Sequence, residues 1–171
     1  MSAKNILGYV GYYGPVINLI IFIFFIVSLY LNNSINLKIL IFLILIQPIS
    51  SIFNHYLKKI IKQPRPKKNK PINYLDKKTL SSKQYGMPSG HAQANALLVT
   101  LSYLSNIPNL ILFIMVIFSI LTIWQRYEYR MHTANQLIAG TLFGIIIAII
   151  YWYLTISPEI KYTDKNKTKS N

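Results

Sequence analysis

Residues 86–91, Gly-Met-Pro-Ser-Gly-His, combine residue types that could bind and transfer a phosphate group. Ser89 is a favourable N-cap residue, Pro88 suits the start of a helix, and Gly90 would let a ligand approach the backbone. The free N–H groups and the positive dipole end of a helix N terminus attract phosphate. His91 can hold a proton near neutral pH. Such a stretch alone is more often an ordinary helix start, so its meaning depends on the rest of the chain.

Two more ionisable clusters lie at the ends of apolar segments: Lys58 with Arg65, and Arg126 with His132. The first pair follows the second apolar segment, His91 begins the third, and the last pair lies between the fourth and the fifth. An alternating path through a membrane therefore predicts that all three clusters lie on one face. Interfacial Lys and Arg side chains that reach for headgroups are the alternative. This alternative does not explain two His residues and a Ser-Gly pair on the same face, so we expect a functional site there.

The apolar segments are long enough to cross a bilayer core, which takes about 20 residues as a helix. We predict an all-α, polytopic membrane bundle with about five transmembrane helices, over residues 15–31, 37–57, 91–105, 110–124 and 133–156. Pro48 should kink the second helix, and the four-residue spacing of Gly140 and Gly144 favours close packing of the last. Residues 1–13 form a short start, and 58–85 a polar loop with room for a short interfacial helix. The membrane domain spans 1–156, followed by a charged, disordered tail, 157–171.

The composition excludes several classes of function. The chain has 171 residues, 53% of them hydrophobic, a formal net charge of +14 and no Cys. Such a charge on a soluble protein would indicate nucleic-acid binding, but the apolar segments exclude that role and place the basic loops at a membrane surface or around a phosphate. Thiolate catalysis and Cys-ligated metals are excluded. Glu128 is the one carboxylate in the three clusters, and Mg²⁺ sites rely on carboxylates, so we predict no metal and no cofactor.

Together the three clusters resemble the signature of the type 2 phosphatidic acid phosphatase superfamily. The first motif of this family is similar to Lys58 followed, after six residues, by Arg65-Pro66. Its second motif is similar to Pro88-Ser89-Gly90-His91, and its third to Arg126 followed, after five residues, by His132. The resemblance implies a helical membrane enzyme that transfers a phosphoryl group from a lipid without a metal, through a phosphohistidine. Most members have six membrane helices, whereas we count five here.

The resemblance also implies a role for each matching residue. His132 would be the nucleophile, and His91 would protonate the leaving oxygen and later activate water. The phosphate would be bound by five residues: Lys58, Arg65, Ser89, Gly90 and Arg126. His55 is expected to face lipid headgroups and to bind no ligand.

Two positions depart from the usual third motif. Gln125 stands where the family usually has Ser, and Gln136 where it usually has Asp. Gln136 lies one helical turn after His132 and can accept its N–H, but it cannot stabilise an imidazolium as a carboxylate does. One interpretation is an inactive member; the favoured one is the dolichyldiphosphatase-like branch, which is similar in Gly-Met-Pro-Ser and His-Thr-x-x-Gln. A polyprenyl diphosphate is thus the first substrate hypothesis. The alternatives are a phosphatidate-type monophosphate and a non-catalytic protein that binds lipid phosphate.

The orientation in the membrane is predicted from charge. Thirteen of the eighteen Lys and Arg residues fall on the face with the three clusters, which predicts that the site faces the cytoplasm. The dolichyldiphosphatase resemblance implies the endoplasmic reticulum and a luminal site instead. The oligomeric state is not predicted.

Overall fold

Two long helices form the first part of the chain, and the second of them begins at a side-chain cap. The computed structural model describes residues 3–82 and 85–157. Helix α1 spans Ala3–Leu31, and α2 spans Leu37–Ile61. Asn36 caps α2, its side chain accepting a hydrogen bond from the Ile39 N–H at 2.9 Å, and Lys62 ends α2 in a left-handed conformation with φ 53°.

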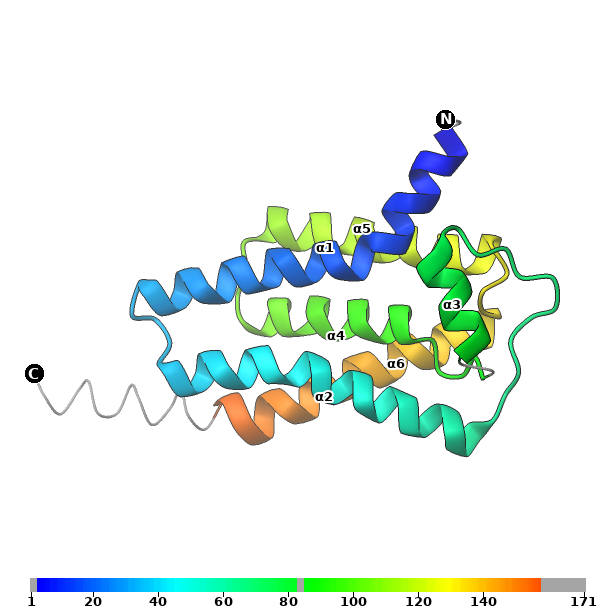
Figure 1. Cartoon of the computed structure of the whole chain (residues 1–171). Coiled ribbons are helices and arrows are strands. Elements are labelled where there is room, and N and C mark those ends of the chain that lie inside the picture. Colours follow the sequence, from blue (N-terminus) through cyan, green and yellow to red (C-terminus); the bar gives the residue numbers. More distant parts are fainter. Residues whose placement is uncertain (1–2, 83–84, 158–171) are drawn as a thin grey trace, which may run out of the picture.

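Both helices are longer than predicted from the sequence. Residues 3–14 are helical, so the expectation of a separate start before residue 15 was wrong. Glycines at these positions lower helix propensity, but here they let α1 approach α5 closely: a Cβ atom on Gly11 would collide with the backbone of Leu121. The first turns of α1 are angled away from the rest of the helix (Figure 1). Pro15 lies inside α1, and a Pro within a helix favours a bend. Helix α2 continues beyond residue 57, which places Lys58 inside its last turn.

The second half of the chain contributes the rest of the bundle. Helix α3 spans Tyr74–Ser82 within the predicted polar loop, α4 spans Gly90–Leu104, and α5 spans Asn109–Glu128. Helix α6 spans Ala134–Tyr151 and continues as a π-helical turn, η1, over Trp152–Ile156. Gln125 and Arg126 lie inside α5, which corrects the expectation of a polar junction from residue 125. The predicted tail falls, apart from Ser157, outside the described residues.

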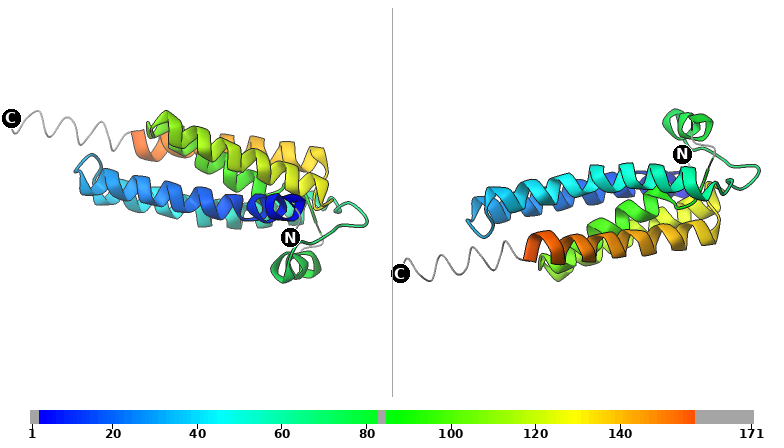
Figure 2. Two further views of the ribbon diagram at one scale, coloured as in Figure 1. Left: turned by 90° about the horizontal axis from the view of Figure 1, so that it is seen from above. Right: turned by 90° about the horizontal axis from the view of Figure 1, so that it is seen from below.

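Helix α4 is the centre of the bundle. It packs against α1, α2, α5 and α6, and Figure 2 shows it between the α1–α2 pair and the α5–α6 pair. Its Leu97, Leu98 and Leu101 side chains are completely buried. A Cβ atom on Gly140 would collide with the Ser89 carbonyl oxygen, and one on Gly144 with that of Gln93. The predicted close packing through these two glycines is therefore confirmed, with α4 as the neighbour.

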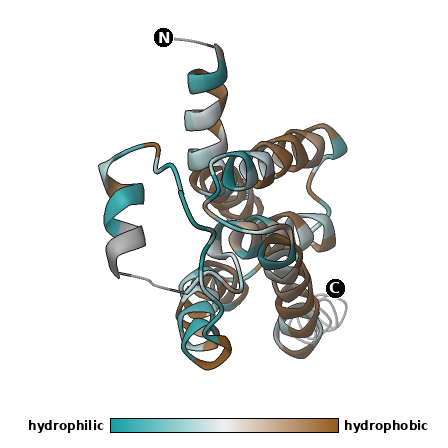
Figure 3. Cartoon of the chain, turned by 90° about the vertical axis from the view of Figure 1, so that its right-hand side faces the viewer, coloured by the Kyte–Doolittle hydropathy of each residue, from teal (hydrophilic) through white to brown (hydrophobic). Residues whose placement is uncertain are grey.

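The outer surface of the bundle is apolar. Large hydrophobic side chains such as Phe24, Ile60 and Leu154 are more than 70% exposed. In the described part of the chain, four helices are long and apolar enough to cross a membrane: Lys4–Leu31, Leu37–Ile61, Asn109–Glu128 and Ala134–Ile156. Hydrophilic residues gather in the segments at one end, which faces the viewer in Figure 3. The predicted all-α membrane bundle is confirmed, and the chain is an integral membrane protein. About five membrane helices were predicted; four of these are long and apolar enough to span in the described residues, and the remaining one, α4, is a short central helix of 15 residues.

Candidate active site

The last turn of α2 places a buried ammonium group beside residues 86–91. Lys58 is 6% exposed, and its Nζ donates hydrogen bonds to the carbonyl oxygens of Gly86, at 3.3 Å, and of Pro88. An antiparallel bridge between Pro64 and Tyr85 and a 2.8 Å bond from the Gly86 N–H to the Gln63 carbonyl hold the two segments together. The first and second sequence motifs therefore form one unit.

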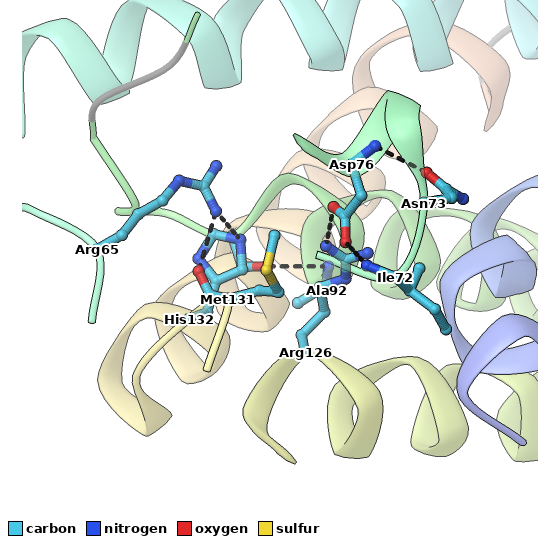
Figure 4. A network of polar contacts seen from close by, with 9 residues as sticks. Arg65, Ile72, Asn73, Asp76, Ala92, Arg126, Met131 and His132 are labelled. Atoms are coloured by element: carbon cyan, nitrogen blue, oxygen red, sulfur yellow. Dashed lines mark hydrogen bonds and ion pairs between the residues drawn. The ribbon is translucent and has the colours of Figure 1, made fainter. Parts of the chain in front are cut away.

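Arg65 links this unit to the third motif. Its Nη1 donates to the Met131 carbonyl oxygen at 2.9 Å and lies 3.1 Å from Nε2 of His132 (Figure 4). The guanidinium group is a permanent donor, so the Nε2 atom that faces it must be the unprotonated nitrogen of a neutral imidazole. The lone pair of Nε2 is thus directed toward a guanidinium group, a type of side chain that commonly pairs with phosphate.

Gln136 fixes the same tautomer from the other side of the ring. Its Nε2 donates to the Pro64 carbonyl at 2.8 Å and to Oε1 of Gln63 at 3.0 Å, which leaves its Oε1 as the acceptor 3.2 Å from Nδ1 of His132. The Gln136 Oε1 also accepts from the Thr133 N–H at 3.2 Å and completes a capping box at the start of α6. Gln at this position therefore caps the start of α6 and also contacts the His132 ring.

The N terminus of α4 is built as the sequence predicts. Ser89 is the N-cap and is completely buried, and its Oγ accepts a long hydrogen bond, 3.5 Å, from the Ala92 N–H. The Ser89 N–H donates to the Gln136 carbonyl at 2.9 Å, which joins the start of α4 to that of α6. Gly90 lies close to Oδ1 of Asn54, and the ring of His91 lies 5.6 Å from that of Tyr12.

Arg126 has a partner that the sequence analysis missed. Its Nη1 donates to Oδ1 of Asp76 at 2.8 Å, and both side chains are only 2% exposed. The other carboxylate oxygen accepts from the Ile72 N–H at 3.2 Å, so α3 is docked onto α5 through this ion pair (Figure 4). The guanidinium group also lies 5.0 Å from the centre of the Tyr12 ring. Nε and Nη2 of Arg126 are buried, and no described residue accepts a hydrogen bond from either.

A cavity of about 320 Å³ joins these groups. Of the eight predicted site residues, five line it: Lys58, Arg65, Gly90, His91 and His132. The other three, Ser89, Arg126 and Gln136, are not among its lining residues and are packed in the protein interior. His55, which was expected to face lipid headgroups, is exposed and also lines this cavity.

The electrostatics of the cavity favour an anion and a neutral nucleophile. Burial lowers the pKa of His132 well below its usual value, and the positive charges of Arg65, Lys58 and Arg126 lower it further. An imidazole in this state keeps its lone pair at neutral pH. In the described part of the chain, no three His, Asp or Glu side chains come together as a metal site would require. Lys58 and Arg65 are the Lys and Arg side chains among the residues that line this cavity.

Sequence reasoning missed Asp76, Tyr12 and the α2–α4 polar network. The sequence around Asp76 does not predict which element this residue contacts. The loop over residues 62–73 carries α3 to the site, and it shows no periodic pattern of apolar residues from which its path could be predicted. The Thr133-x-x-Gln136 capping box was a readable signal, as was the polar face of α2. Asn54, four residues before Lys58, donates to the Gln93 side chain at 2.6 Å.

Comparison with known proteins agrees with this geometry. Searches among curated proteins and among solved structures each returned no significant match. The family model described as PAP2 superfamily matches residues 36–157, which include α2 to α6 and all eight predicted site residues. Because this match covers well over half of the chain, with the three motifs assembled around one cavity, the protein belongs to the PAP2 superfamily.

Proposed function

We propose that the protein hydrolyses a lipid phosphate through a phosphohistidine at His132, with no metal ion. Membership of the PAP2 superfamily supports a lipid phosphatase-type function at a membrane. The observation that supports the mechanism is the position of His132: Nδ1 is 3.2 Å from the Gln136 acceptor, and Nε2 is 3.1 Å from Arg65 in a cavity with three further site residues. This arrangement presents a nucleophile where a phosphate would bind.

The first step would transfer the phosphoryl group to the protein. Arg65 moves from Nε2 of His132 to the phosphate oxygens as the substrate enters, and Lys58 and the N–H groups at the start of α4 bind the others. Nε2 attacks phosphorus and the bond from phosphorus to the leaving oxygen breaks. His91, which would enter the step protonated once the charge of the bound phosphate offsets the nearby cations, donates its proton to that oxygen. Arg126, held at Nη1 by Asp76, lies behind the cavity lining, and its positive charge would offset the increasing negative charge.

The second step would regenerate the enzyme. His91, now deprotonated, takes a proton from a water molecule that attacks the phosphorus. The bond between phosphorus and Nε2 breaks, and the electron pair returns to the imidazole. The products are inorganic phosphate and the dephosphorylated leaving group, and no net proton or electron remains on the protein.

Within this reaction class, our first substrate is a polyprenyl diphosphate of the dolichyl type. Gly-Met-Pro-Ser at 86–89 and Gln136 in place of Asp support this branch. A phosphatidate-type monophosphate is the second candidate, and the neutral polar lining of the cavity along α2 favours it. A protein that binds lipid phosphate without turnover is the third. The orientation that charge favours puts the site on the cytoplasmic face.

A panel assay tests this function. The purified chain should release inorganic phosphate from at least one lipid among a prenyl diphosphate, a prenyl monophosphate and phosphatidate in mixed micelles. His132→Ala should release none. Binding of these lipids without phosphate release from any of them would contradict the enzymatic proposal and favour the non-catalytic alternative.

A further inference from the structure

One face of α2 is polar from the site to the middle of the helix. Its residues follow the spacing of a single helix face, and all of them line the cavity: Gln47, Ser50, Ser51, Asn54, His55 and Lys58. Eleven residue steps along a helix correspond to about 16 Å. Neighbouring α2 side chains off this face, such as Ile49, Ile52 and Phe53, are apolar and exposed. Polar groups so deep in a membrane helix require protein, water or a polar ligand as a partner.

Half of this polar face is explained by packing and by the phosphate site. Gln93 of α4 donates to the Ser50 carbonyl at 3.1 Å and to the Ser50 hydroxyl at 2.8 Å, and Asn54 donates to Gln93. These bonds hold α2 against α4. Lys58 belongs to the phosphate site. Gln47, Ser51 and His55 remain without such an explanation.

These three residues form the α2 edge of the cavity. Oε1 of Gln47 is buried, and no described residue donates to it. Ser51 and His55 are exposed. The opposite wall is apolar, formed by Pro15 and Val16 of α1, and Val16 is 51% exposed. The two helices diverge from their connecting turn toward the site (Figure 1). Exposed side chains of both helices, Val16, Ser51 and His55, line the cavity, so part of its rim lies on the surface that would face the bilayer.

We infer that Gln47, Ser51 and His55 bind oxygen atoms of the leaving group, on the far side of the transferred phosphoryl group. This inference rests on the proposed function and concerns its substrate. The ligand chemistry is a hydrogen-bonding oxygen a few bonds from the reacting phosphorus, supplied by a second phosphate or by glycerol ester groups. A prenyl monophosphate continues directly into hydrocarbon and would leave these polar side chains unpaired, which disfavours it as a substrate.

The lining also distinguishes the two sources of oxygen. The Gln47 amide and the Ser51 hydroxyl suit ester oxygens, whereas a ring N–H of His55 could also donate to a second phosphate. Lys58 is the one Lys or Arg on this face of α2.

The test compares kcat/KM of the wild type and of Gln47→Leu/Ser51→Ala on a prenyl monophosphate, a prenyl diphosphate and phosphatidate. We expect a loss of roughly 10-fold or more on a lipid with leaving-group oxygens, and a change under about threefold on the prenyl monophosphate. Phe53→Leu, on the lipid-facing side of the same turn, is the matched control and should change none of the three. A loss on phosphatidate alone assigns glycerol oxygens. A loss of kcat/KM on the diphosphate that becomes larger when His55→Leu is added would show that the oxygens bound here belong to a second phosphate.

Binding measurements separate this inference from the proposed function. These measurements use His132→Ala protein with and without the added Gln47→Leu/Ser51→Ala changes, and they record how much each lipid raises the thermal midpoint. The added changes should reduce the rise caused by phosphatidate or by the diphosphate, and should leave the rise caused by the prenyl monophosphate unchanged. This result would support the polar subsite even if the wild type releases no phosphate. Equal effects on all three lipids in both assays, or no effect in either, would overturn the inference.

Discussion

The buried ion pair between Asp76 and Arg126 should contribute far more to stability than the exposed pair between Lys4 and Glu128. The two distances are nearly the same, 2.8 Å and 2.7 Å, but the side chains are 2% exposed in the first pair and 62% and 42% exposed in the second. Burial is therefore the main difference between them. Asp76→Asn and Glu128→Gln are matched changes, since each replaces one carboxylate oxygen with an amide nitrogen.

The expected magnitude follows from what the Asp76 carboxylate does. It accepts from Arg126 with one oxygen and from the Ile72 N–H with the other. An Asn side chain can accept from only one of these donors and would turn its own N–H groups toward the other. Breaking a buried pair by removing one partner costs about 3–5 kcal/mol, and for a chain of this size this corresponds to a fall of roughly 6–20 °C in Tm. Glu128→Gln should leave Tm nearly unchanged because solvent screens that pair.

The assay is the temperature at which half of the purified protein stops eluting as a single species from size exclusion in detergent. Replacing both partners with apolar residues, Asp76→Leu with Arg126→Met, should recover much of the Tm lost in Asp76→Asn, since no buried charge is left unpaired. Similar Tm losses for Asp76→Asn and Glu128→Gln would refute the reasoning. So would a double variant less stable than Asp76→Asn alone.

Three other predictions concern the chemistry at His132. Phosphate release should persist in excess EDTA because cationic side chains replace the metal; loss on chelation that Mg²⁺ restores would contradict this. NMR of labelled histidine should show that the imidazole of His132, one of three His in the chain, has a pKa below 6.5. Inorganic phosphate should raise this pKa by offsetting the nearby cations. A pKa above 7 in the free protein would mean that the shift has the opposite direction to the one expected. Gln136→Ala should lower kcat about 10- to 100-fold. Gln136→Asp should stay active, whereas Gln136→Glu should lose more activity. The second carboxylate oxygen of Glu would face the Pro64 carbonyl oxygen, to which the Gln136 amide now donates. Equal activity of the Asp and Glu variants would argue against that contact.

Much of the fold was readable because the bilayer imposes simple rules. The predicted helices appear in order, and the spacing of Gly140 and Gly144 predicted close helix packing, which occurs between α4 and α6. The errors lie at helix ends. Residues 3–14 contain three glycines and little apolar periodicity, but packing of α1 against α5 makes them helical, because tertiary contacts outweigh local propensity.

The candidate site was predictable where spacing along the chain defines it. His132 and Gln136 lie one turn apart, and their contact follows from that spacing and from the capping box. Asp76 was not predictable, because its contact with Arg126 spans fifty residues and depends on the path of an aperiodic loop. Tyr12 belongs to α1, before the region that matches the family model, so no motif could indicate its contacts with Arg126 and His91.

The most direct test of the account is to trap the phosphoenzyme. Wild-type protein mixed with a lipid substrate labelled at the transferred phosphate, then denatured within milliseconds, should retain label in a bond that is stable to base and labile to acid, as expected for phosphohistidine. His91→Ala should accumulate more label with a diphosphate, because a good leaving group needs little protonation while water attack still needs a base. His132→Ala should retain no label and release no phosphate. Full turnover by His132→Ala, or label that remains when His132 is absent, would contradict the proposed mechanism.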